Sequence, residues 1–74
     1  MRQVIKPAQL EVLMSIYSLR DLPQATRQAV RLRIVNGYTY EWAELETGVT
    51  RKRIALAVDK LELAHEQIKT VYGL

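Results

Sequence analysis

The sequence contains no cysteine and only one histidine, His65. Disulfide frameworks, zinc fingers and thiol catalysis are excluded, because each needs residues that this chain lacks. Three glycines and two prolines are too few for a low-complexity or fibrous protein. The longest uninterrupted apolar run extends only from Ile54 to Val58, far short of a membrane span or a signal-peptide core. The sequence therefore predicts a cytosolic protein that is stabilised by packing alone.

Patterns typical of catalysis are missing as well. The sequence has no glycine-rich phosphate loop, no paired acids for general acid–base chemistry and no nucleophile triad. His65 stands without the cysteine or carboxylate pattern of a metal ligand or a catalytic base. We expect neither an enzyme nor a bound cofactor, metal or small-molecule substrate.

The residues that are present predict one small globular domain over residues 1–74. The chain has 74 residues, 49% apolar and 26% charged. Its net charge of +3 is unevenly distributed, because residues 41–48 hold three acids and no base while bases outnumber acids on both sides. Such a pattern is compatible with a basic face for an anionic polymer, and also with simple solubility.

The first predicted helix covers residues 7–20. Pro7 suits its first turn, and apolar residues at helical spacing predict a packed face. This face consists of Leu10, Leu13, Met14 and Tyr17. A second apolar row indicates that the helix is covered on more than one side, by its own domain or by another chain. This second row consists of Val12, Ile16 and Leu19.

The second predicted helix covers residues 24–35. Asn36 and Gly37 end it through a left-handed cap. Arg27 and Arg31 lie one turn apart and give the helix a basic edge. The residues expected to face inward are Ala25, Ala29 and Leu32.

Two further helices are predicted, a short one over residues 40–47 and a long one that begins after Thr50 and ends near Val71. Thr39 and Thr50 are suited to cap them, and Gly48 permits a tight turn between them. The long helix keeps one apolar stripe, formed by Ile54, Ala57, Val58, Leu61, Ala64, Ile68 and Val71. Because no strand alternation is present and every connection is short, we expect an all-α domain of four helices.

The segment from Tyr40 to Val58 has the pattern of a helix-turn-helix, with a short helix, a glycine-containing turn and a longer helix capped by threonine. In such a unit the second helix enters the major groove of DNA. Glu44 departs from the pattern, since a small residue usually stands four positions before the turn glycine. Either the turn is one residue longer, or Glu44 leans outward.

Three consecutive cations, Arg51, Lys52 and Arg53, occupy the first turn of the long helix. The positive end of a helix dipole disfavours each of them by about 0.3 to 1 kcal/mol at low salt. A DNA phosphate at this end would reverse the sign of that effect. The alternative is that Glu44 or Glu46 pairs with these bases within the chain. We favour the DNA interpretation.

Projection of the long helix at 100° per residue divides the predicted DNA contacts into two sets. The residues expected to face the bases are Lys52, Ala55, Leu56 and Asp59, flanked by Arg51 and Arg53. Basic side chains can donate hydrogen bonds to guanine, and apolar side chains can contact the thymine methyl group. Asp59 either accepts a hydrogen bond from cytosine N4 or is an ordinary solvated carboxylate. The residues expected to contact the DNA backbone are Thr39, Tyr40, Thr50, Arg27, Arg31 and Lys60.

Three aromatic residues allow another interpretation of the same region. Trp42, Tyr38 and Tyr40 could form a stacking platform for single-stranded nucleic acid. At their helical spacing, core and backbone contacts are the favoured interpretation.

Several short motifs together resemble the KorA/TrfB-type transcriptional repressors of bacterial conjugative plasmids. They are Gln9-Leu10, Val30-Arg31 with Ile34-Val35-Asn36-Gly37, Gly48-Val49-Thr50-Arg51 and Ala57-Val58, and the resemblance spans about residues 5–67. It implies a homodimeric repressor in the bacterial cytoplasm that binds palindromic operators of plasmid genes through a helix-turn-helix. Gly48, Thr50 and Arg51 match the turn and the start of the recognition helix. Ala55 and Leu56 depart from the polar residues that family members can carry there.

The length of the last helix predicts a homodimer. Its apolar stripe continues beyond the part that a helix-turn-helix needs, so two apolar surfaces remain to be covered in one small domain. They could cover each other within the monomer, or a two-fold pair could bury them and place two recognition helices one DNA turn apart. The residues expected at this interface are Val12, Ile16, Leu19, Ala64, Ile68 and Val71. A small protein-interaction module, such as an adaptor or antirepressor, is the alternative function.

Overall fold

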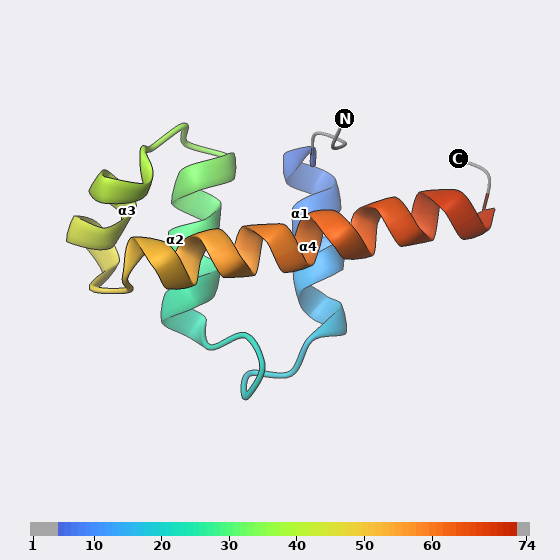
Figure 1. Ribbon diagram of the computed structural model, residues 1–74, viewed down its shortest axis with the longest axis horizontal. Helices are drawn as coiled ribbons and strands as arrows, with labels where there is room; N and C mark the ends of the chain where they lie inside the picture. Colours follow the sequence, from blue (N-terminus) through green and yellow to red (C-terminus); the bar gives the residue numbers. More distant parts are fainter. Residues whose placement is uncertain (1–4, 73–74) are drawn as a thin grey trace.

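The computed structural model describes residues 5–72, and within this range the chain forms four α-helices and no β-strand. α1 spans Pro7–Ile16, α2 spans Gln24–Ile34, α3 spans Tyr40–Thr47 and α4 spans Arg51–Tyr72. The predicted all-α class with four helices is confirmed. In Figure 1, α1 and α2 lie beside each other, α3 lies at the end next to α2, and α4 runs along the longest axis of the molecule. α4 contacts each of the other three helices.

One apolar core joins the four helices along the buried face of α4. The fully buried side chains at its centre come from α1, the α1–α2 connection, α2 and α4, and they are Leu10, Met14, Leu22, Val30, Ile54 and Leu61. Burial of side chains of this size stabilises each by roughly 1.5 to 3 kcal/mol relative to an exposed position. The predicted packed faces of α1 and of the first half of α4 are therefore confirmed.

The packed face of α2 differs from the prediction. Thr26, Ala29 and Val30 are buried, whereas Ala25 is exposed. Relative to the prediction, α2 is rotated about its own axis by about one residue position, or 100°. Thr26 therefore takes the buried position that was expected for Ala25. Leu32 is partly buried and packs against the core from the side.

α1 ends at Ile16 and does not extend to Arg20 as predicted. Tyr17 has extended backbone angles, with φ −94° and ψ 145°. The reason lies in α2, because the guanidinium of Arg27 donates to the carbonyl oxygens of Met14 at 2.8 Å, Tyr17 at 2.6 Å and Leu22 at 2.6 Å. These bonds hold the end of α1 and the connection that follows it.

The remaining helix ends follow the predicted local chemistry. The Thr39 hydroxyl accepts the backbone N–H of Trp42 at 3.2 Å, and the Thr50 hydroxyl accepts that of Arg53 at 3.3 Å. Gly37 has a φ of 72°, and the Tyr38 N–H beyond it donates to the Leu32 oxygen at 3.0 Å, which closes α2. None of the described helices is both long enough and apolar enough to cross a membrane.

Candidate nucleic-acid interface

α3 and α4 are joined by a three-residue turn, Gly48, Val49 and Thr50. Gly48 has left-handed backbone angles, φ 76° and ψ 0°, and its N–H donates to the Glu44 oxygen at 2.8 Å. Val49 is buried and fixes the turn against the core. A residue that has a Cβ is disfavoured in this left-handed conformation, so the turn depends on glycine.

Glu44 leans away from the core, and Ala43 supplies the small buried residue of α3 instead. The Glu44 carboxylate accepts the backbone N–H of Arg51 at 3.0 Å. This carboxylate therefore occupies part of the positive end of α4, where an anion is favoured. The departure from the helix-turn-helix pattern has a structural use in this chain, as a cap for the next helix.

The three cations at the start of α4 fall into two classes. The Arg51 guanidinium donates to the Glu41 carboxylate at 3.2 Å, in a pair whose two side chains are 62% and 75% exposed. The intrachain alternative thus applies to Arg51, although its acid is Glu41 and not Glu44 or Glu46. Within residues 5–72, the side chains of Lys52 and Arg53 have no acid partner, and both are exposed.

The exposed face of the first half of α4 lies opposite the buried stripe that contains Ile54, Ala57, Val58 and Leu61. This exposed face carries Lys52, Arg53, Leu56, Asp59 and Lys60. Leu56 is 62% exposed, although it is a large apolar residue. Ala55 lies at the margin and is half-buried. The predicted division of α4 into a packed and a solvent-facing side is confirmed, and the base contacts remain predictions.

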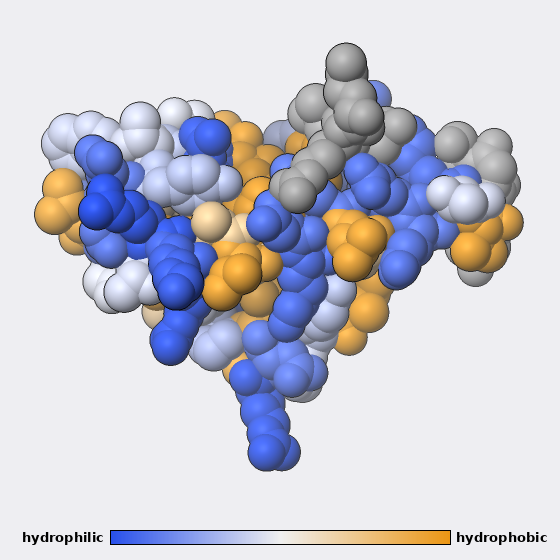
Figure 2. All heavy atoms as spheres, viewed as in Figure 1, coloured by the Kyte–Doolittle hydropathy of each residue, from blue (hydrophilic) through white to orange (hydrophobic). Residues whose placement is uncertain are grey.

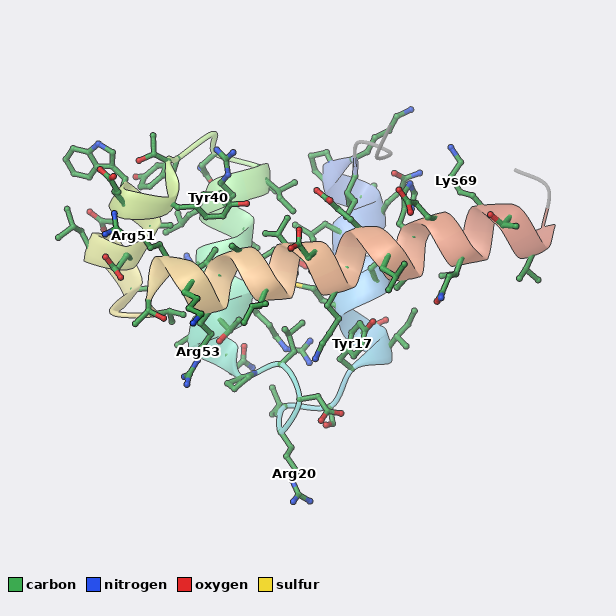
Figure 3. All side chains as sticks on the ribbon, in the orientation of Figure 1. Tyr17, Arg20, Tyr40, Arg51, Arg53 and Lys69 are labelled. Carbon is green, nitrogen blue, oxygen red and sulfur yellow. The ribbon has the colours of Figure 1, made fainter. Side chains whose placement is uncertain are left out.

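A basic cleft separates this face from the α1–α2 connection. Its volume is about 340 Å³, and its lining consists of Arg20, Asp21, Leu22, Pro23, Thr26, Arg53, Leu56, Ala57 and Lys60. Figure 3 shows the side chains of Arg20 and Arg53 on the same side of α4, while Arg51 lies beside α3. The Lys60 ammonium lies 5.5 Å from the centre of the Tyr17 ring. Sequence reasoning missed Arg20, because it placed this residue at the end of a helix that in fact stops earlier.

Most of the predicted DNA-backbone contacts are engaged within the chain. Arg27 holds the three carbonyl oxygens described above, and the Arg31 guanidinium pairs with Glu11 at 2.9 Å. The Tyr40 ring lies beneath the Arg33 guanidinium, with 4.5 Å between the carbon of the guanidinium and the ring centre. Thr39 and Thr50 cap helices, as described. Lys60 is the member of this set that the structure places on the exposed face of α4.

The three aromatic residues near α3 have different environments. Tyr38 and Tyr40 are partly buried and pack against the core, as predicted. The expectation that Trp42 is also a core residue is wrong, because its side chain is 58% exposed. The next residue, Ala43, occupies the inward position of this short helix.

Four of the six predicted dimerisation residues line a second candidate surface at the far end of α4. Ile16, Ala64, Ile68 and Val71 line a shallow groove between the ends of α1 and α4, together with Tyr17 and Gln67. Ala64 and Ile68 are partly buried and pack against the core, so this part of the α4 stripe is partly covered within the monomer. Val12, Ile16, Leu19 and Val71 nevertheless remain more than half exposed. In Figure 2 the face in view is mostly hydrophilic and is interrupted by isolated apolar patches.

Comparison of the chain with protein-family models, curated proteins and solved structures gives no match. Within the described residues, no group of histidine and carboxylate side chains is arranged to hold a metal ion. Function is therefore inferred from the geometry of α3, α4 and the surfaces beside them.

Proposed function

We propose that α3, the Gly48 turn and α4 act as a helix-turn-helix, and that the protein is a sequence-preferring regulator of transcription that binds duplex DNA. The first half of α4 would enter the major groove, whose width admits one helix. The arrangement of a short helix, a left-handed glycine turn and a longer capped helix supports this proposal.

The observation that carries the proposal is the solvent-facing position of Lys52 and Arg53 in the first turn of α4, without an acid partner in the described chain. Cations are disfavoured at this end of a helix. The same chain neutralises Arg51 and Arg31 with acids. Two cations that remain free on one exposed face are suited to a polyanion such as the DNA backbone.

The chemistry of this face also suits recognition of bases. Lys52 lies opposite the packed stripe and can donate to guanine O6 and N7, and the exposed Leu56 can contact a thymine methyl group. Arg53 lies on the flank of the helix, from which a side chain reaches phosphates. We accordingly assign base selection to Lys52 and Leu56 and positioning to Arg53.

The proposed active form is a homodimer. The groove lined by Ile16, Ala64, Ile68 and Val71 leaves apolar area that a second copy would cover. A two-fold pair would present two α4 helices to two half-sites about 34 Å apart. Repression of plasmid genes from palindromic operators, which the resemblance to KorA/TrfB-type repressors implies, forms part of this proposal.

Selection of bound duplexes from a random pool tests the proposal. We expect the recovered sequences to contain an inverted repeat. Lys52→Ala should weaken binding to the recovered site by about 1 to 3 kcal/mol and relax the preference at one base pair. The matched control is Lys69→Gln, which removes one positive charge near the C-terminal end of α4 and should leave the preference unchanged.

Two results would argue against this function. Recovery of no common sequence, together with unchanged binding by Lys52→Ala, would indicate the alternative, a protein-interaction module with the same helix arrangement. Equal weakening of selected and random DNA by Lys52→Ala would show that this side chain contacts phosphate and that a different side of α4 faces the bases.

A further inference from the structure

The basic cleft beside α4 contains cations from two separate parts of the chain. Arg20 comes from the α1–α2 connection, and Arg53 and Lys60 come from α4, seven residues, or about two helical turns, apart. Asp21 also lines the cleft. Three cations and one carboxylate leave the lining with an excess of positive charge. The lining also contains the apolar residues Leu22, Leu56 and Ala57.

The connection that carries Arg20 is held in place by the rest of the chain. The Arg27 guanidinium binds the carbonyl oxygens of Tyr17 and Leu22, on either side of Arg20. Between them, the Ser18 hydroxyl donates to the Asp21 carboxylate and accepts the Asp21 N–H, both at 3.2 Å. The Asp21 carboxylate thus already has a partner in the connection. The backbone of this short segment is therefore preorganised, although the Arg20 side chain is exposed.

The position of the cleft relates it to the proposed DNA-binding face. Projection of α4 at 100° per residue puts Arg53 and Lys60 on one flank of the helix, next to the side that carries Lys52 and Leu56. A helix inserted in the major groove has a sugar–phosphate strand along each flank. The strand on this flank would pass the mouth of the cleft, which Arg20 borders from the opposite side.

We propose that this cleft is a phosphate-binding site, in which Arg20, Arg53 and Lys60 together hold a backbone phosphate of the DNA strand that borders the groove. This inference rests on the proposed function and extends it, because it assigns a DNA contact to the α1–α2 connection, outside α3 and α4. It also gives Arg27 an indirect part in binding, since Arg27 positions the connection that presents Arg20. The proposed ligand is a phosphodiester group of the DNA backbone. The alternative ligand with the same phosphate group is a free phosphorylated small molecule.

The test compares Arg20→Gln with Lys69→Gln, which removes the same charge far from the cleft. Binding to the selected duplex and to a random duplex is measured between 0.05 and 0.3 M salt, about the range in which counterion release is resolved. Loss of one phosphate contact in each subunit of the dimer should lower the magnitude of the log–log salt slope by about 1.8, which corresponds to an affinity loss of about 60-fold at 0.1 M salt. Arg20→Gln should show this loss equally for both duplexes, and Lys69→Gln should not show it. In the Arg53→Gln background, Arg20→Gln should have a smaller effect than in the wild-type protein, because the two cations share one phosphate.

The outcomes separate failure of the cleft from failure of the function. If Lys52→Ala changes base preference while Arg20→Gln behaves like Lys69→Gln, DNA binding stands and the phosphate site is wrong. If no duplex binds at all, the proposed function and the DNA phosphate site are both overturned. A parallel titration with inorganic phosphate, followed by the side-chain NMR signals of labelled arginines, completes the test. Shifts of Arg20 and Arg53 with phosphate, but none with duplex, would identify a small phosphorylated ligand and overturn the DNA assignment.

Discussion

Substitution of Arg27 distinguishes a structural role from a DNA-binding role for a residue that looked like a DNA contact in the sequence. Arg27→Gln removes a guanidinium whose three nitrogens donate to three carbonyl oxygens, at 2.6, 2.8 and 2.6 Å. A glutamine side chain is shorter, carries no charge and can reach at most one of these oxygens. We therefore expect the protein to lose stability while retaining the salt-dependent DNA contacts of α4.

The magnitude follows from the type of bond that is lost. A hydrogen bond to a charged group contributes about 1.5 to 3 kcal/mol. The three bonds share one side chain, and the carbonyl oxygens regain water when it is removed, so the total loss is well below three times that value. We expect the free energy of unfolding to fall by about 2 to 4 kcal/mol, which for a domain of this size lowers the melting temperature by about 10 to 30 °C.

Thermal unfolding followed by circular dichroism measures this change, and Arg31→Gln is its matched control. Arg31 lies one turn further along α2 and pairs with Glu11 on the surface, where the two side chains are 35% and 57% exposed. Such a pair contributes no more than about 1 kcal/mol, so the control should melt within a few degrees of the wild-type protein. Equal melting temperatures for the two variants would refute the structural assignment of Arg27. A salt slope that Arg27→Gln reduces by more than Arg20→Gln does, measured where the variant is fully folded, would restore a direct DNA-binding role for Arg27.

Two other substitutions test the proposed dimer and the turn. Ile16→Asp changes a side chain that is 59% exposed and lines the groove at the end of α1, so it should give a monomer in sedimentation that still folds and binds half-sites weakly. Wild-type protein that sediments as a monomer, well above its operator affinity and without DNA, would contradict this interface. Gly48→Ala should lower the free energy of unfolding by about 1 to 2 kcal/mol through backbone strain alone, since nothing lies within 4 Å of the added Cβ. Gly48→Asn should melt at a higher temperature than Gly48→Ala, because asparagine tolerates this conformation better; the opposite order would argue against strain as the cause.

Features that depend on neighbouring residues in the sequence could be predicted. The bounds of α3, the threonine caps of α3 and α4, the left-handed cap at Gly37 and the tight turn at Gly48 all agree with the structure. Each is set by interactions within about four residues, so the local sequence contains the necessary information. The packed face of α4 was predictable for the same reason, because helical periodicity fixes which residues share a side.

Features that depend on contacts between distant residues could not be predicted in this way. α1 ends at Ile16 because Arg27, more than ten residues later, binds the carbonyl oxygens at its end. The helical pattern of α1 continues to Leu19 in the sequence, and the local signal for an earlier end is limited to Ser18 and Asp21, which are spaced as in a capping box and bond to each other in the structure. Arg20 consequently became part of a candidate site that the sequence did not suggest.

The charges of the candidate interface show both parts of this division. Residue spacing alone places Arg51, Lys52 and Arg53 in one helical turn and gives α4 an exposed side opposite its apolar stripe. Which cations have an acid partner depends on how the helices pack, because Glu41 pairs with Arg51 and Glu11 pairs with Arg31 across helices. Spacing along a helix fixes the direction of a side chain, whereas an ion pair requires two groups within about 4 Å of each other in space. The packing of α3 against α4 and of α1 against α2 supplies that proximity, and it leaves Lys52 and Arg53 facing solvent without an acid partner in the described part of the chain.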